Sequence, residues 1–197
     1  MKTVRKLHRG GALLVGIFVL IHLANHLAAL QGIEAHLRFM EAARLLYRQP
    51  LVEGLLLLAV LAQAASGLRM LMGKRRSDPI ARLQAASGAY LALFLLIHVS
   101  AVLFGRAVLD LDTNVHFAAA GLQVWPYQLF FVPYYFLAVL ALFAHLGCAL
   151  ARRAGTAALV VPLCAGALVS SLIVAALMGK LLPYEVPPMY RQTYAQT

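Results

Sequence analysis

Long runs of apolar residues, separated by short polar segments, make up most of this chain. Five runs are long enough to cross about 30 Å of hydrocarbon at about 1.5 Å per helical residue. They cover residues 10–30, 51–72, 84–105, 130–150 and 157–179. Backbone polar groups in lipid must bond within their own segment, so these runs predict helices. The sequence therefore predicts an all-α bundle of five transmembrane helices, forming a single domain over residues 1–197.

Three segments outside these runs have patterns of their own. Residues 33–48 mix apolar and charged positions as an amphipathic helix does, which predicts a short helix lying on the membrane surface. Residues 110–127 are expected to form a longer outer loop whose aromatic end lies at the membrane interface. The tail, residues 182–197, contains three prolines and is expected to be extended.

Composition supports a membrane location. The chain is 62% hydrophobic, whereas soluble domains are about half apolar. Cys148 and Cys164 both lie inside apolar runs, which indicates reduced packing residues rather than a disulfide framework. The sequence contains no nucleotide-binding fingerprint, no CxxC or CxxCH motif and no hydrolase triad, so we expect no catalytic residue.

The net charge of +10 comes from basic residues that flank the apolar runs. They are Lys2, Arg5, Lys6 and Arg9 before the first run, Lys74, Arg75, Arg76 and Arg82 after the second, and Arg152 and Arg153 after the fourth. These segments alternate along the chain, so they share one side, which the positive-inside rule assigns to the cytoplasm. We therefore expect a multi-pass protein of the bacterial cytoplasmic membrane, with its N-terminus inside, its C-terminus outside and no nucleic-acid partner.

Four histidines lie within the apolar runs, where a titratable side chain is costly and often functional. They are His22, His26, His98 and His145. A six-coordinate b-type haem takes one imidazole from each side, usually from two facing helices. The helical rise places His22 about 18 Å and His98 about 21 Å from the inner ends of their runs, so both lie in the outer half. His145 lies about 22 Å from the outer end of its run, in the inner half.

His26 follows His22 by one turn on the same face, so the two cannot lie on opposite sides of one haem. We expect His26 to donate to a propionate or to a quinone oxygen. The alternative, in which each histidine is a hydrogen-bonded packing residue, stays open. The remaining histidines, His8, His36 and His116, are expected at the surface or in loops, where water solvates them.

The sequence resembles the single-chain, five-helix cytochrome b anchor of succinate dehydrogenases and fumarate reductases over residues 7–180. The similar strings are LHRGG, FVLIHL around His22, RLQAASGAYLALFLLIHV over residues 82–99, and LALFAHLGCAL around His145. The resemblance implies that His22 and His98 bind the outer haem. It places the inner ligands at Gln63 and His145, but glutamine is a poor haem ligand, so one haem b is expected and the inner one is in doubt.

The resemblance also implies partners and a role. The chain would anchor a flavoprotein and an iron–sulfur subunit on the cytoplasmic side and pass electrons between them and quinone, without catalysing a reaction itself. Arg82, Gln84 and Ser87 would bind the quinone, although Arg82 also fits the positive-inside rule and Ser87 a small-residue packing step. Two alternatives stay open: a stand-alone membrane cytochrome b, which Gln63 favours, and a haem-free transporter or structural membrane protein with the same fold.

Overall fold

The computed structural model describes residues 2–72 and 78–194, and within these ranges it contains helices and no strand. Its long helices are α1 (Lys2–Ala28), α3 (Pro50–Leu71), α4 (Pro79–Ala107), α6 (Gln128–Ala154) and α7 (Val160–Leu177). Short 3₁₀ turns extend α1 through Ala29–Gln31 and precede α7 at Thr156–Leu159. All five are long and apolar enough to cross a membrane. The predicted all-α class and the five helices of membrane-spanning length are therefore confirmed.

Several helix ends lie outside the apolar runs because capping residues determine them. The carboxylate of Asp78 accepts a hydrogen bond from the backbone N–H of Ala81 at 2.8 Å, and Pro79 occupies the first helical position of α4. At the end of α6, Gly155 adopts a φ of 88°, a conformation that favours glycine. As a result, α4 begins several residues before the apolar run that predicted it.

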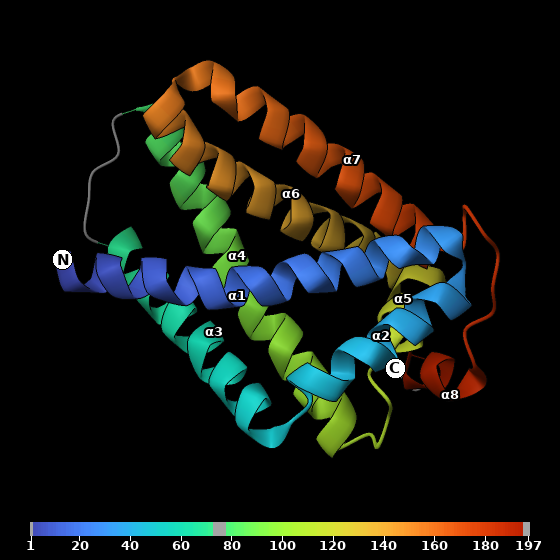
Figure 1. Ribbon diagram of the computed structural model, residues 1–197. Helices are drawn as coiled ribbons and strands as arrows, with labels where there is room; N and C mark the ends of the chain where they lie inside the picture. Colours follow the sequence, from blue (N-terminus) through green and yellow to red (C-terminus); the bar gives the residue numbers. More distant parts are fainter. Residues whose placement is uncertain (1, 73–77, 195–197) are drawn as a thin grey trace.

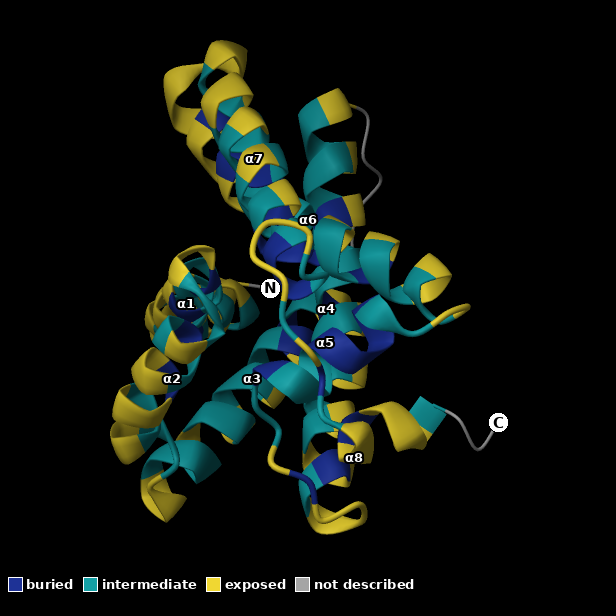
Figure 2. Ribbon diagram, turned by 90° about the vertical axis from the view of Figure 1, so that its right-hand side faces the viewer, coloured by how far each residue is buried: buried dark blue, intermediate teal, exposed yellow. Residues whose placement is uncertain are grey.

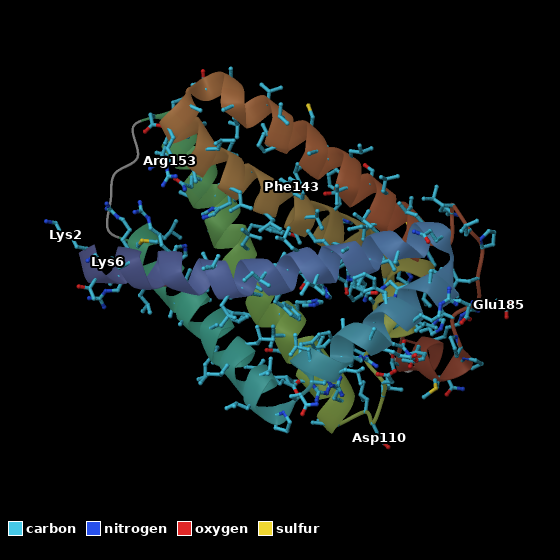
Figure 3. The ribbon with its side chains drawn as sticks, viewed as in Figure 1. Lys2, Lys6, Asp110, Phe143, Arg153 and Glu185 are labelled. Atoms are coloured by element: carbon cyan, nitrogen blue, oxygen red, sulfur yellow. The ribbon has the colours of Figure 1, made fainter. Side chains whose placement is uncertain are left out.

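The helices form two packed groups that α4 links (Figure 1). Helix α6 packs along α4 and α7, whereas α1 packs mainly on α3, and α3 also packs on α4. Lys2, Lys6 and Arg153 lie at one end of the bundle, and Asp110 and Glu185 at the other (Figure 3). We call these the basic end and the acidic end. Lys74, Arg75 and Arg76, which were predicted to share the basic side, lie outside the described residues.

The acidic end is covered by three further segments. Helix α2 (Ile33–Tyr47) forms where the amphipathic pattern predicted a helix. The expected loop over residues 110–127 is wrong in part, because it contains the helix α5 (Val115–Gln123). The tail is also not extended throughout, since it includes α8 (Pro188–Arg191) and a 3₁₀ turn at Gln192–Tyr194; its last three residues lie outside the described ranges.

Helix α5 forms the centre of the acidic end (Figure 2). The side chain of Asn114 caps it by accepting a hydrogen bond from the backbone N–H of His116 at 2.8 Å. Its buried face includes Ala119 and Leu122, both with none of their surface exposed. Leu122 packs with Ile173 and Leu177 of α7, and Ala119 packs with tail residues. An apolar segment of this length is too short to cross a membrane, so hydropathy alone did not distinguish it from a loop.

Candidate haem site and two histidine cradles

His22 of α1 and His98 of α4 face each other in the interior of the bundle, with their ring centroids 6.1 Å apart. Each histidine stacks on a phenylalanine one turn before it, with centroids 5.6 Å apart for Phe18 and His22 and 5.0 Å apart for Phe94 and His98. The two five-residue segments that run from the phenylalanine to the histidine have nearly the same sequence, FVLIH and FLLIH. The structure thus brings together the two residues that the depth argument paired.

The spacing of this pair can be compared with that of two imidazoles on one iron. With a metal–nitrogen bond of about 2.0 Å and about 1.1 Å from the nitrogen to its ring centre, opposed imidazole centres stand about 6 Å apart. The observed 6.1 Å fits this value. Helices α1 and α4 also make little direct contact through their backbones. In these respects the residues fit a b-type haem.

His26, also on α1, connects this pair to α2 at the acidic end. Its Nε2 is hydrogen-bonded to Nε2 of His22 at 3.2 Å, and its Nδ1 to Nε2 of His36 on α2 at 3.3 Å. We call His22, His26 and His36 the histidine string. If His22 bound iron through Nε2, this hydrogen bond to His26 would be lost. The predicted contact of His26 with a propionate or a quinone remains a prediction.

The expectation that His36 is solvated is wrong, because only 1% of its surface is exposed. Helix α2 folds back against α1 and turns this side chain towards His26. Burial lowers the pKa of His36 to about 4, from an ordinary value of about 6.5. Its Nδ1 is buried without a hydrogen-bond partner among the described residues. A neutral imidazole at this position is therefore strongly favoured.

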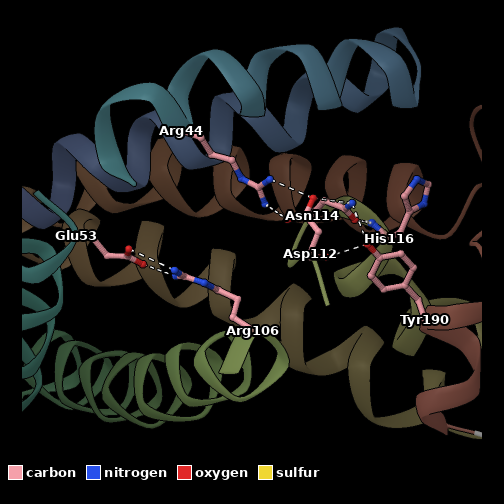
Figure 4. A network of polar contacts seen from close by, with 7 residues as sticks. All are labelled: Arg44, Glu53, Arg106, Asp112, Asn114, His116 and Tyr190. Carbon is pink, nitrogen blue, oxygen red and sulfur yellow. Dashed lines mark hydrogen bonds and ion pairs between the residues drawn. The ribbon is translucent and has the colours of Figure 1, made fainter. Parts of the chain in front are cut away.

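A polar network lies beside the string at the acidic end (Figure 4). Arg44 of α2 forms an ion pair with Asp112 at 2.8 Å, and the hydroxyl of Tyr190 donates to the backbone carbonyl of Asp112 at 2.9 Å. His116 was also expected to be solvated, but its ring lies against Tyr190 with centroids 5.8 Å apart, and burial lowers its pKa. The network ties α2, α5 and the tail together.

His145 packs against Gln84, Ser87 and Gly88 of α4 at the basic end. We call such a group of residues around one imidazole a histidine cradle. Its Nδ1 lies 3.0 Å from the carbonyl oxygen of Gln84 and 3.4 Å from the hydroxyl of Ser87. Its ring lies directly on Gly88, where a Cβ atom would come within 2.9 Å of the imidazole Cε1. His145 is thus separate from the pair formed by His22 and His98, as its predicted depth implies.

His8 is half-buried in a similar cradle on α3, so the expectation that water solvates it fails in part. Its Nδ1 lies 3.0 Å from the hydroxyl of Ser66, and its Nε2 lies 3.2 Å from the amide nitrogen of Gln63. A Cβ atom on Gly67 would come within 3.3 Å of its ring. The expectation failed because hydropathy did not extend α1 back to His8, whereas the helix begins at Lys2.

The two cradles have the same sequence, Gln-Ala-Ala-Ser-Gly, at residues 63–67 and 84–88. The pentapeptide can be read directly from the sequence. In both copies the serine and glycine meet an imidazole from a neighbouring helix. A repeated pentapeptide in two adjacent spans is therefore the signal from which the cradles were predictable.

The three residues predicted to bind quinone have different surroundings. Ser87 is buried and its hydroxyl donates to the carbonyl oxygen of Leu83 at 2.8 Å. Gln84 uses its backbone carbonyl for His145, and Arg82 is exposed at the start of α4. Only Ser87 and Gln84 are therefore joined in one cluster, through His145.

An aromatic groove lies between α4 and α6, beside His98. Its volume is about 280 Å³, and its lining includes Tyr90, Phe94, Pro133 and Tyr134. The hydroxyl of Tyr90 donates to the backbone carbonyl of Tyr134 at 3.0 Å. Phe94 also stacks on His98, so one aromatic ring joins the groove to the histidine pair.

Comparison with protein-family models, with curated proteins and with solved structures gives no match for this chain. The interpretation of the site therefore depends on its own residues.

Proposed function

We propose that this protein is a haem b-binding subunit of a membrane electron-transfer complex, with His22 and His98 as the axial ligands. The observation that carries the proposal is the opposed placement of these two rings, 6.1 Å apart, on two helices of the bundle. A haem b held in this way supplies reversible one-electron transfer.

The side chains around the pair would hold the ligands in place. Phe18 and Phe94 each stack on one imidazole and limit its rotation. Tyr135 closes a further side of His98, with ring centroids 6.4 Å apart in an edge-on contact. Burial in an apolar bundle favours the neutral form of an imidazole, which is the form that binds a metal. These side chains therefore keep the two histidines in an orientation and a neutral form that can bind a metal, without binding it themselves.

The charge distribution supports a cytoplasmic location for the basic end (Figure 3). In this proposal the N-terminus is inside and the C-terminus is outside, in a bacterial cytoplasmic membrane. The basic end would receive the flavoprotein and iron–sulfur subunits of a succinate or fumarate enzyme. Quinone would exchange electrons near Arg82, Gln84 and Ser87, of which Arg82 is exposed at that end.

The test is a reduced-minus-oxidised visible spectrum of the purified protein, with the haem quantified per chain. We expect a low-spin, bis-histidine spectrum that His22→Ala and His98→Ala both abolish. His116→Ala is the matched control, because it removes a half-buried histidine of the acidic end outside the hydrogen-bonded string. A folded wild-type protein without haem would exclude the proposal. Co-purification of soluble subunits separates an anchor from a stand-alone cytochrome b.

The histidine string favours a second candidate function, which belongs to a haem-free protein. His26 uses both ring nitrogens for hydrogen bonds to other imidazoles, and an imidazole of this kind can accept a proton at one nitrogen and release one at the other. The string would then carry protons between the acidic end and the interior of the bundle.

Liposomes containing a pH-sensitive dye and the haem-free protein test this second function. A proton flux that His26→Phe removes and His145→Phe retains would support it. No flux above that of empty liposomes would exclude it.

A further inference from the structure

We propose that Tyr47, the last residue of α2, is a positioning residue that holds the imidazole of His22 in its orientation by packing on Phe18. The inference rests on the proposed function, in which His22 binds the iron of a haem. Tyr47 acts through Phe18 and does not bind the iron itself.

Three aromatic rings from two helices form a continuous row that ends at His22. Phe18 lies nearly parallel to His22, with an angle of 16° between the ring planes and 5.6 Å between the centroids. Tyr47 meets Phe18 edge-on, at 83° and 5.5 Å, which is a favourable geometry for two aromatic rings. Because parallel rings in contact cannot turn independently, the imidazole of His22 can rotate only if Phe18 also moves. Tyr47 opposes that movement from α2.

The second ligand of the proposed pair, His98, has a similar row of rings on another side of the bundle. Phe94 lies nearly parallel to His98, at 12° and 5.0 Å. Phe94 in turn contacts Tyr134 of α6, with the centroids 4.8 Å apart. Each ligand therefore stacks on a phenylalanine that a tyrosine supports. The tyrosine comes from a long spanning helix in one row and from the short helix α2 in the other.

Polar contacts fix the end of α2 that carries Tyr47 (Figure 4). Arg44, one turn earlier on α2, forms an ion pair with Asp112 at 2.8 Å, and its guanidinium also interacts with the side chain of Tyr47. Asp112 lies between α4 and α5, and the hydroxyl of Tyr190 donates to its backbone carbonyl at 2.9 Å. The position of Tyr47 against Phe18 is therefore set by contacts that reach from α2 to the tail.

The orientation of an axial imidazole has a measurable consequence in a bis-histidine haem. The d orbitals of ferric iron overlap with the π system of each imidazole, so the angle between the two ring planes changes the g values of the ferric signal. The ring planes of His22 and His98 stand at 64° to each other. A residue that holds this angle therefore influences the spectrum without touching the iron.

A purely structural role for Tyr47 makes a different prediction. Tyrosine is common at the membrane interface, where it anchors a helix. Loss of such an anchor would lower the stability of the protein and leave the angle between the imidazoles unchanged. Tyr190 supplies the matched control, because it is a buried tyrosine of the acidic end that packs on His116 and on α5.

The experiment records the electron paramagnetic resonance spectrum of the oxidised protein and its variants, with the haem counted per chain. We expect Tyr47→Ala to keep one haem and to shift and broaden the largest g value, because His22 then adopts a wider range of orientations. Tyr47→Phe retains the ring and should give the wild-type signal. Tyr190→Ala should lower the stability and leave the signal unchanged. If Tyr47→Ala does not retain haem, Tyr47→Leu, which leaves less empty space, takes its place.

The possible outcomes separate the inference from the function on which it rests. Unchanged g values in Tyr47→Ala, with a wild-type signal that His22→Ala removes, would overturn the inference and leave the proposed function standing. The inference would also fail if Tyr190→Ala shifted the signal as far as Tyr47→Ala, because a general loosening of the acidic end would then be responsible. A shift in Tyr47→Phe as large as that in Tyr47→Ala would rule out the ring contact as its basis. A folded wild-type protein with no haem would overturn both.

Discussion

The two ends of the bundle are held together by different interactions. At the acidic end, α2, α5 and the tail cover the long helices, and the core contains large buried side chains such as Leu122 and Leu177. At the basic end, helices meet through small residues such as Ala64 and Ala144 and through the two histidine cradles. The acidic end resembles the core of a water-soluble protein, whereas the basic end resembles the helix contacts of a membrane interior.

This difference separates two ways of placing a histidine. His36 and His26 owe their positions to helices that meet only in the folded chain, since α2 must fold back on α1. His8 and His145 are placed by a pentapeptide that the sequence contains twice. Substitutions at the acidic end should therefore disturb packing, and those at the basic end should disturb the orientation of an imidazole.

The largest effect is expected for Gly121→Val in α5. A Cβ atom at Gly121 would lie 2.4 Å from the ring of Phe131, which is itself packed into the core of the acidic end. Overpacking of this kind should lower the free energy of unfolding by about 3 kcal/mol. Denaturation of the purified protein in detergent measures it. Gly16→Val is the control, because no atom lies within 4 Å of a Cβ atom there; equal losses in both variants would contradict the packing argument.

A smaller effect is expected for the glycines of the cradles. A Cβ atom at Gly88 would come within 2.9 Å of His145, and one at Gly67 within 3.3 Å of His8. Gly88→Ala should therefore cost about 1–2 kcal/mol, and Gly67→Ala less. The same denaturation experiment checks the order of the two variants. A larger loss for Gly67→Ala would contradict the order that the two Cβ-to-ring distances predict.

The acidic end should also lose stability as the pH falls. The pKa of His36 is about 4 in the folded protein, below its ordinary value of about 6.5, so the unfolded chain binds the proton first. This contribution is complete above about pH 6.5 and falls by about 1 kcal/mol as the pH drops from about 7 to about 5.5. The titratable and charged groups that act on His36 are His22, His26, His116 and Arg44.

Unfolding measured across this pH range, in the wild type and in His36→Leu, tests the assignment. We expect the variant to lose less stability than the wild type as the pH falls. Identical pH profiles would mean that another group is responsible.

The smallest effects are expected for the serines of the cradles. Ser66 is the hydrogen-bond acceptor of Nδ1 of His8, at 3.0 Å. Ser87 is the weaker of two partners of His145, at 3.4 Å. Ser66→Ala should cost about 1 kcal/mol, and Ser87→Ala less than that, because the carbonyl of Gln84 remains. If Ser87→Ala were the more damaging variant, the carbonyl would not be the main partner of His145.

Much of the fold was readable from the order of apolar and polar residues. The five spans and the helix at residues 33–47 follow from run length and periodicity, because these depend on neighbours along the chain. The depths assigned to His22 and His98 follow from a fixed rise per residue, and the structure places the two rings 6.1 Å apart. The repeat that forms the cradles is equally local, because it consists of five consecutive residues in each copy.

Only the tertiary structure decided which of the remaining histidines are buried. His36 and His116 lie in short segments whose sequence fits a solvated surface, but the folded chain buries His36 fully and His116 in part. Helix α5 itself is too short for a hydropathy signal, and its burial depends on contacts with α7 and the tail. Periodicity along a chain reports which face of a helix is apolar, whereas burial depends on residues distant in sequence that cover that face.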